Sequence, residues 1–117
     1  MKYKVASLGQ TVIKYEVPFN IYMTLNQIYE SKLDKLKPAN KQLVGKIKNE
    51  HSLFYNGQEG TKMTKHNHLP LDILKWFEAC YLHYLNWNKI EDHSINLISI
   101  WVNTMFENEY NPVHVHQ

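Results

Sequence analysis

The sequence contains little cysteine, glycine or proline. Its 117 residues include one cysteine, four glycines and four prolines, whereas hydrophobic residues make up 44%. The single cysteine, Cys80, excludes a framework of disulfides and favours a reducing, intracellular setting. Because the hydrophobic share is large, we expect a folded chain with its own core. The length fits one domain, which we expect to span residues 1–117.

A strong charge of one sign and long apolar runs are also missing. The formal net charge is +2 and the lysines are scattered, so no nucleic-acid partner is indicated. Lys2, Lys4, Lys14 and Glu16 interrupt the amino-terminal stretch, which excludes the apolar segment of a signal peptide. Residues 94–106 are uncharged, but a membrane helix needs ~20 apolar residues. We therefore expect a soluble, cytoplasmic protein without a membrane partner.

The first half of the chain predicts a hairpin and a helix. Residues 3–8 and 11–17 are rich in β-branched and aromatic side chains, and Gly9-Gln10 between them indicates a turn. Asn20 is the expected N-cap of a helix that ends near Pro38. Its apolar stripe has helical spacing and comprises Tyr22, Leu25, Tyr29, Leu33 and Leu36, widened by Ile21 and Ile28.

The second half predicts a connection, a helix and a strand. Residues 39–69 read as a long connection in which residues 43–47 and 52–55 could be short strands or turns, with turn signals at Asn56-Gly57 and Glu59-Gly60. Pro70 opens a second helix that fades at residues 86–88 and should cover a face of a sheet. Residues 94–106 form a strand that is apolar on both faces and therefore buried on both. These elements place the chain in the α+β class.

The carboxyl end carries the strongest pointer to function, the pair His114 and His116. On a strand, side chains two residues apart leave the same face, so both imidazoles would face one way. Two such imidazoles can chelate one metal ion, and a non-haem Fe(II) site needs three protein ligands with open positions. Imidazole suits Fe, Zn, Cu and Ni alike, so the pair alone does not select the metal.

The residues around this pair add a family pattern. The run from Ser99 to Phe106 contains Trp101-Val102-Asn103, and the acidic stretch from Glu107 precedes Asn111-Pro112-Val113-His114-Val115-His116. This order resembles a group of phage and bacterial Fe(II)/2-oxoglutarate oxygenases, in which a Trp-x-Asn strand, a short turn and an Asn-Pro-x-His-x-His-like stretch follow one another. The resemblance covers about twenty residues of the 117.

The resemblance implies a fold and cofactors. The family fold is a double-stranded β-helix, so the chain would supply amino-terminal strands and two helices packing on the first strands of an incomplete jelly roll. Fe(II) and 2-oxoglutarate would be the cofactors of the intact parent, with His114 and His116 as metal ligands. Asn103, Asn111 and Trp101 are the candidates for contact with the ligands or the substrate, with a cap of the turn before Pro112 as the alternative and favoured role of Asn111. The substrate of the parent's hydroxylation is unknown.

Two departures bear on activity. Most members of the wider superfamily have a carboxylate as second ligand, where this chain has His116. The distal His and the basic residue that anchors 2-oxoglutarate lie on later strands in the family. We therefore expect a chain that is truncated after the His-x-His motif and inactive alone, possesses an open sheet edge that invites self-association, and resides in the host cytoplasm if phage-encoded. The alternatives are a non-catalytic α+β interaction module and a cupin-like metal-binding protein with three histidines.

The remaining candidates have simpler interpretations. His66 and His68 form a second His-x-His, which would bind a metal alone or with the tail pair, but lysines nearby favour a solvated loop. His51 is expected in an exposed loop. Cys80 lies in an apolar stripe, which favours an inert core thiol over a nucleophile.

Overall fold

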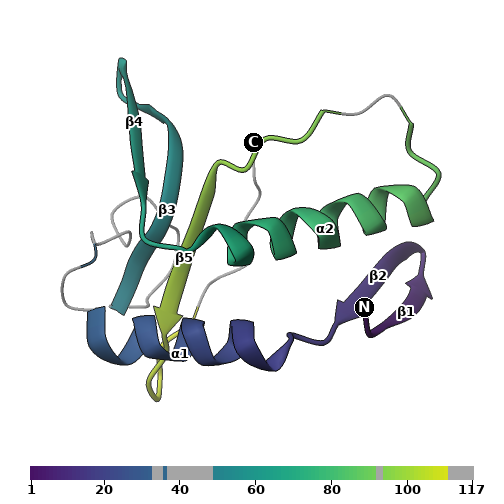
Figure 1. Cartoon of the computed structure of the whole chain (residues 1–117), viewed down its shortest axis with the longest axis horizontal. Coiled ribbons are helices and arrows are strands. Elements are labelled where there is room, and N and C mark those ends of the chain that lie inside the picture. Colours follow the sequence, from purple (N-terminus) through teal and green to yellow (C-terminus); the bar gives the residue numbers. More distant parts are fainter. Residues whose placement is uncertain (33–35, 37–48, 92–93, 111–117) are drawn as a thin grey trace. The chain divides into compact units, whose positions relative to one another are not determined.

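The structure is a computed structural model that describes residues 1–32, 36, 49–91 and 94–110. Within these residues the elements follow the order β1, β2, α1, β3, β4, α2 and β5 (Figure 1). The chain divides into two compact units. The first comprises Met1–Tyr29 and Pro70–Leu97, and the second Glu30–Leu69 and Ile98–Gln117. Helices and small antiparallel sheets confirm the predicted α+β class.

The first unit begins with a β-hairpin. Strand β1 (Tyr3–Leu8) pairs antiparallel with β2 (Gln10–Tyr15), so that Tyr3 lies opposite Tyr15. The chain reverses at Gly9, whose φ of +87° is a backbone conformation that only glycine adopts without steric cost. The predicted hairpin is confirmed, although Gln10 belongs to the strand and not to the turn.

Helix α2 (Leu71–Trp87) follows its prediction closely. Pro70 occupies the N-cap position, just before the first helical residue, and the Asp72 carboxylate lies in the first turn, near the positive end of the helix dipole. The side chains that turn away from solvent recur three or four positions apart, as an amphipathic helix requires. Among them are Ile73, which is fully buried, and the half-buried Trp76, Phe77, Cys80 and Tyr84.

Two tyrosine hydroxyls form hydrogen bonds between the hairpin and α2. The Tyr15 hydroxyl lies 3.1 Å from the Cys80 carbonyl oxygen and 2.7 Å from Nδ1 of His83. From the helix side, the Tyr84 hydroxyl donates to the Thr11 carbonyl oxygen at 2.9 Å. Burial, with smaller effects of Cys80 and the neighbouring tyrosines, raises the pKa of Tyr15, which keeps its hydroxyl protonated as a donor. The prediction that this helix covers a sheet face is thus confirmed for the hairpin.

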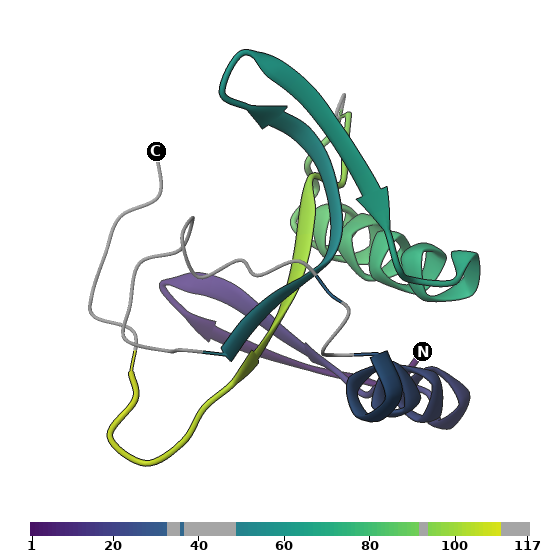
Figure 2. The same ribbon diagram turned by 90° about the vertical axis from the view of Figure 1, so that its left-hand side faces the viewer.

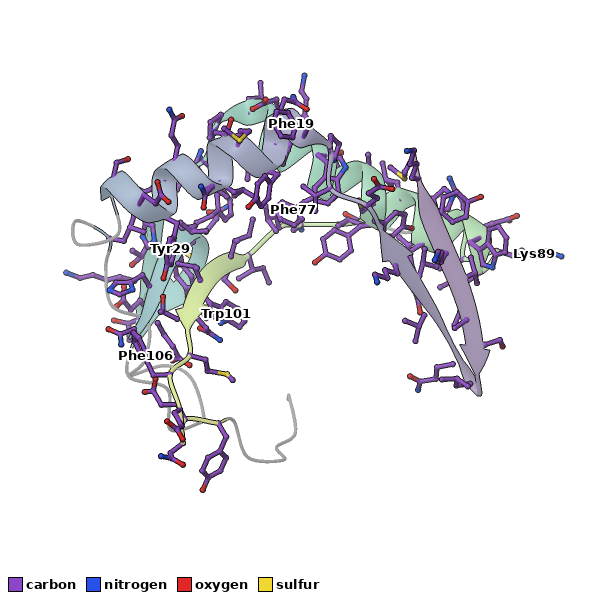
Figure 3. The ribbon with its side chains drawn as sticks, turned by 90° about the horizontal axis from the view of Figure 1, so that it is seen from below. Phe19, Tyr29, Phe77, Lys89, Trp101 and Phe106 are labelled. Atoms are coloured by element: carbon purple, nitrogen blue, oxygen red, sulfur yellow. The ribbon has the colours of Figure 1, made fainter. Side chains whose placement is uncertain are left out.

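Helix α1 (Phe19–Lys32) starts two residues earlier than predicted. The amide of Tyr22 already donates to the Pro18 carbonyl oxygen at 2.9 Å, so Asn20 lies inside the helix and is not its N-cap. The buried line runs through Ile21 and Ile28, each 5% exposed, and not through the tyrosines. Figure 3 labels Phe19 and Tyr29 near opposite ends of this helix, and both side chains are exposed.

The second unit is built on a three-stranded antiparallel sheet. Its strands are β3 (Asn49–Glu59), β4 (Lys62–Asn67) and β5 (Ser99–Thr104), in the order β4-β3-β5 (Figure 2). The prediction of a long connection over residues 39–69 is therefore wrong for residues 49–67. The turn signal at Glu59-Gly60 is correct, since Gly60 has a φ of +67° between paired Glu59 and Lys62.

The Asn56-Gly57 turn signal is wrong because this glycine serves packing inside β3. A Cβ atom at Gly57 would lie 3.3 Å from Cγ2 of Ile98 and 3.3 Å from the Tyr55 hydroxyl oxygen. The missing side chain leaves room for the Tyr55 ring, whose hydroxyl donates to the Gln58 carbonyl oxygen. A glycine in a strand interior often marks such a close approach.

Strand β5 is shorter and more exposed than the sequence predicts. It covers residues 99–104 of the expected 94–106. Ile100 and Val102 are half-buried on one face, whereas Trp101 is 39% exposed on the other. The prediction of a strand buried on both faces is wrong for this reason.

No helix in the described ranges is long and apolar enough to cross a membrane. The longest of them, α2, has 17 residues and carries Asp72, Lys75 and Glu78.

The hairpin's attachment to α2 can be tested by replacing Tyr15. Tyr15→Phe removes the hydroxyl that bridges the Cys80 carbonyl and His83, so we expect a loss of about 1–2 kcal/mol in the free energy of unfolding. Chemical denaturation monitored by circular dichroism measures the loss. The matched control is Tyr81→Phe on α2, where the side chain is 53% exposed. We expect this variant to change the free energy of unfolding by no more than about 0.5 kcal/mol. Equal stability of Tyr15→Phe and the wild type would contradict the assignment.

Candidate functional site

The described part of the predicted site lies on β5. In the pairing of β5 with β3, Trp101 is opposite Ser52 and Asn103 is opposite Glu50. Residues directly opposite one another in an antiparallel pair share a face of the sheet. Trp101 and Asn103 therefore share one face with Ser52 and Glu50, and this set is called the polar face below. Figure 3 shows Trp101 on β5 and Phe106 just beyond it.

A turn follows β5, as the polar stretch after it predicts. The amide of Glu109 donates to the Phe106 carbonyl oxygen at 3.1 Å, and the Phe106 amide donates to Oε1 of Glu109 at 2.9 Å. Asn108 has a φ of +70°, a left-handed conformation that asparagine tolerates better than most residues. These contacts define the turn from residue 106 to residue 109.

The predicted metal ligands lie beyond that turn. His114, His116 and Asn111 fall outside the described residues. Of the five predicted site residues, the structure thus places Trp101 and Asn103 on the same face of one strand. Among the described residues, no group of three or more His, Cys, Asp or Glu side chains is arranged to hold a metal ion.

The polar face contains a buried carboxylate that sequence reasoning missed. Glu50 is 3% exposed, and burial raises the pKa of its carboxyl group above the ordinary value of 4.5. Burial acts this way because a charged carboxylate loses its hydration on leaving water. The sequence gave no sign that Glu50 is buried, because its segment was predicted to be irregular. Only the recognition of strand β3 would have pointed to its burial.

Of the two histidines predicted to lie in a loop at residues 66 and 68, His66 belongs to β4 and His68 directly follows the strand. His66 is on β4 directly opposite Tyr55, and the two rings stack with centroids 6.2 Å apart and an interplanar angle of 27°. Nε2 of His66 lies 2.7 Å from Oγ of Ser52. The His68 ring follows at 5.7 Å from the His66 ring. In Lys62-Met63-Thr64-Lys65-His66-Asn67 only Met63 is apolar, so the sequence had no alternation that would have revealed this strand.

The other isolated candidates show no catalytic arrangement. Cys80 is half-buried and burial raises the pKa of its thiol, which opposes a role as nucleophile. His83 is in contact with the hairpin through Tyr15. His51 lies on β3, not in an exposed loop, and its Nδ1 is buried without a hydrogen-bond partner among the described residues.

An open pocket of about 360 Å³ lies in the first unit. Its charged side chains, Lys2 and Glu16, are 4.0 Å apart in an ion pair and strongly exposed. An exposed pair of this kind contributes little to stability, and the other lining side chains, such as Val17, Phe19 and Trp76, are mainly apolar.

No protein-family model, curated protein or solved structure matches this chain.

The burial of Glu50 makes stability depend on pH. Its pKa is raised in the folded state, so the protonated form is favoured, and stability is lost as the pH rises above 4.5 through the folded value. Glu50→Gln keeps the shape without the charge, and we expect it to stabilise the protein at neutral pH by on the order of 1 kcal/mol. Urea denaturation at several pH values measures the effect. The advantage should shrink toward pH 4.5.

The matched control for Glu50 is Glu107→Gln, which changes an exposed carboxylate in the same unit. We expect that variant to follow the wild type at every pH. A stability difference for Glu50→Gln that does not vary with pH would contradict burial of the charged group as its cause.

Proposed function

We propose that this chain forms the amino-terminal part of an Fe(II)/2-oxoglutarate-dependent oxygenase-like domain. In this proposal His114 and His116 are the first two metal ligands. The observation that carries it is the order of elements at the carboxyl end: a Trp-x-Asn strand, a short acidic turn and Asn-Pro-x-His-x-His. The first two of these are described as strand β5 and the turn at residues 106–109.

The proposed fold is a double-stranded β-helix that begins with the β4-β3-β5 sheet. Among the described residues, β4 and β5 form the two edges of this sheet. An open edge presents unpaired N–H and C=O groups that attract a further strand. In the proposed domain further strands of the jelly roll would cover these edges, and a chain lacking them would self-associate there.

The donor set fits part of a non-haem iron site. His114 and His116 would hold the metal, and iron bound there supplies the activation of O₂ that, coupled to decarboxylation of 2-oxoglutarate, permits hydroxylation of a C–H bond. Trp101 and Asn103 share one face of β5, where they would orient a ligand or substrate, with Asn111 near them. The family pattern assigns the third ligand and the 2-oxoglutarate anchor to later strands.

The tail histidines can be tested by metal titration. Co(II), a spectroscopic substitute for Fe(II), is added to the wild type and to a His114→Ala/His116→Ala variant under anaerobic, reducing conditions. Because the variant lacks both proposed ligands, we expect it to bind one Co(II) ion fewer than the wild type, or to bind that ion at least about tenfold more weakly. The intensity of the Co(II) absorption bands measures binding.

A matched control removes two histidines outside the proposed site. His51→Ala/His83→Ala changes one histidine on β3 and one on α2, and it should bind Co(II) as the wild type does. Binding of equal strength by the wild type and by the tail variant would exclude His114 and His116 as ligands.

A non-catalytic interaction module is the second candidate, and the surface of α1 favours it. Phe19, Tyr22, Met23 and Tyr29 are 76%, 55%, 47% and 37% exposed, although they belong to one short helix. Contiguous exposed apolar side chains commonly mark a protein interface. If the control variant loses Co(II) binding as the tail variant does, or if the wild type binds no Co(II), the interaction module is the better supported of the two functions.

A further inference from the structure

We infer that His66 and His68, at the end of β4, form a binding site for a divalent transition-metal ion of the zinc and copper class. This site is separate from the proposed iron ligands in residue composition, and it does not depend on the proposed function. Both histidines are among the described residues, and their surroundings suit a metal ligand in three respects.

The first respect is the backbone that positions the two rings. His66 is within β4. The His68 amide continues the backbone pairing with β3 by donating to the Leu53 carbonyl oxygen at 2.9 Å. The ladder between β3 and β4 thus extends through His68. Residues two apart on an extended segment place their side chains on the same face. Between the neighbours of His68, Oδ1 of Asn67 accepts a hydrogen bond from the Leu69 amide at 2.8 Å, which fixes the point where the chain leaves the sheet.

The second respect is the distance between the rings. The centroids of His66 and His68 are 5.7 Å apart, with an interplanar angle of 46°. A Zn–N bond is about 2.1 Å long, so two imidazoles on one tetrahedral ion place their centroids roughly 5–6 Å apart. The observed separation therefore falls in the range expected for two imidazoles on a single ion.

The third respect is the support of the His66 ring from β3. The Tyr55 ring stacks on it, and Oγ of Ser52 lies 2.7 Å from its Nε2. The Ser52 hydroxyl donates to the Phe54 carbonyl oxygen at 3.5 Å, so Oγ is able to accept a hydrogen bond from Nε2–H. A metal-bound histidine almost always gives its other N–H to such an oxygen, which fixes its tautomer and orientation.

These contacts assign separate roles. His66 would bind the ion through Nδ1 while Nε2–H donates to Ser52, and His68 would supply the second nitrogen. Ser52 and Tyr55 act through His66 and are positioning residues. Water would complete the coordination, because no group of three metal-binding side chains exists among the described residues. Imidazole ligands favour Cu²⁺ and Zn²⁺ over the harder Mg²⁺ and Ca²⁺.

The test uses Zn²⁺ and a background in which the tail pair is absent. In the His114→Ala/His116→Ala chain, we expect isothermal titration calorimetry to detect one Zn²⁺ site. Adding His66→Ala or His68→Ala should weaken it by about tenfold or more, whereas adding His51→Ala, on β3, should leave it unchanged. Because the background lacks the proposed iron ligands, this outcome is independent of whether those residues bind metal.

Two results would overturn the inference. One is a background chain that binds no Zn²⁺; the other is His66→Ala and His68→Ala chains that bind as tightly as their parent. Circular dichroism of each variant monitors folding. A second readout uses the unaltered protein: substoichiometric Cu²⁺ should broaden the imidazole proton resonances of His66 and His68 before those of His51 and His83.

The role of Ser52 has its own test. Ser52→Ala should weaken Zn²⁺ binding by about tenfold, because Nε2–H of His66 loses its acceptor. Ser52→Thr keeps the hydroxyl and should restore the affinity, which a change of packing alone would not do. Unchanged or tighter binding by Ser52→Ala would refute Ser52 as a positioning residue.

Discussion

Pairing of β3 with a strand on each side is the constraint on which the second unit depends. The same strand aligns Tyr55 with His66 of β4 and Ser52 with Trp101 of β5. Between these contacts the β3–β5 register shifts at residues 52–54, where Leu53 is the extra residue of a bulge. Because side chains alternate along a strand, a slip by one residue would move every group of the polar face to the opposite side. Site and fold are therefore specified together.

The first unit relies on a different balance. A two-stranded hairpin is marginal by itself in water, and every residue of β1 is exposed. The hairpin is stabilised by α2, which supplies both ring packing and polar partners. The ring centroids of His83 and Tyr3 are 4.4 Å apart, and the Tyr84 hydroxyl donates to the Thr11 carbonyl oxygen. Directional hydrogen bonds from tyrosines thus compensate for a small apolar contact, and they define which face of the hairpin meets the helix.

Local signals in the sequence predicted the elements whose determinants are local. Pro70 and the helical spacing after it identified α2, and Gly9 identified the hairpin. Within β3 the sequence indicated only a possible short strand at residues 52–55, because Gly57 imitates a turn, and β4 was missed because Met63 is its single apolar residue. The burial of Glu50 and the approach of Ser52 to His66 depend on strands brought together in space. No spacing along the chain encodes those contacts, so sequence reasoning could not reach them.

The two His-x-His pairs illustrate what separates a ligand pair from two surface histidines. Their spacing is identical, and spacing alone guarantees only a shared face. At His66 the neighbouring strand adds a stacked tyrosine and a serine oxygen, which hold one ring so that a metal ion would not have to order it. Ordering a free side chain costs conformational entropy, and a ring already held avoids that cost. For the tail pair, the equivalent support would have to come from groups such as Asn103. Metal affinity should therefore be governed by the strand next to a His-x-His pair as much as by the pair itself.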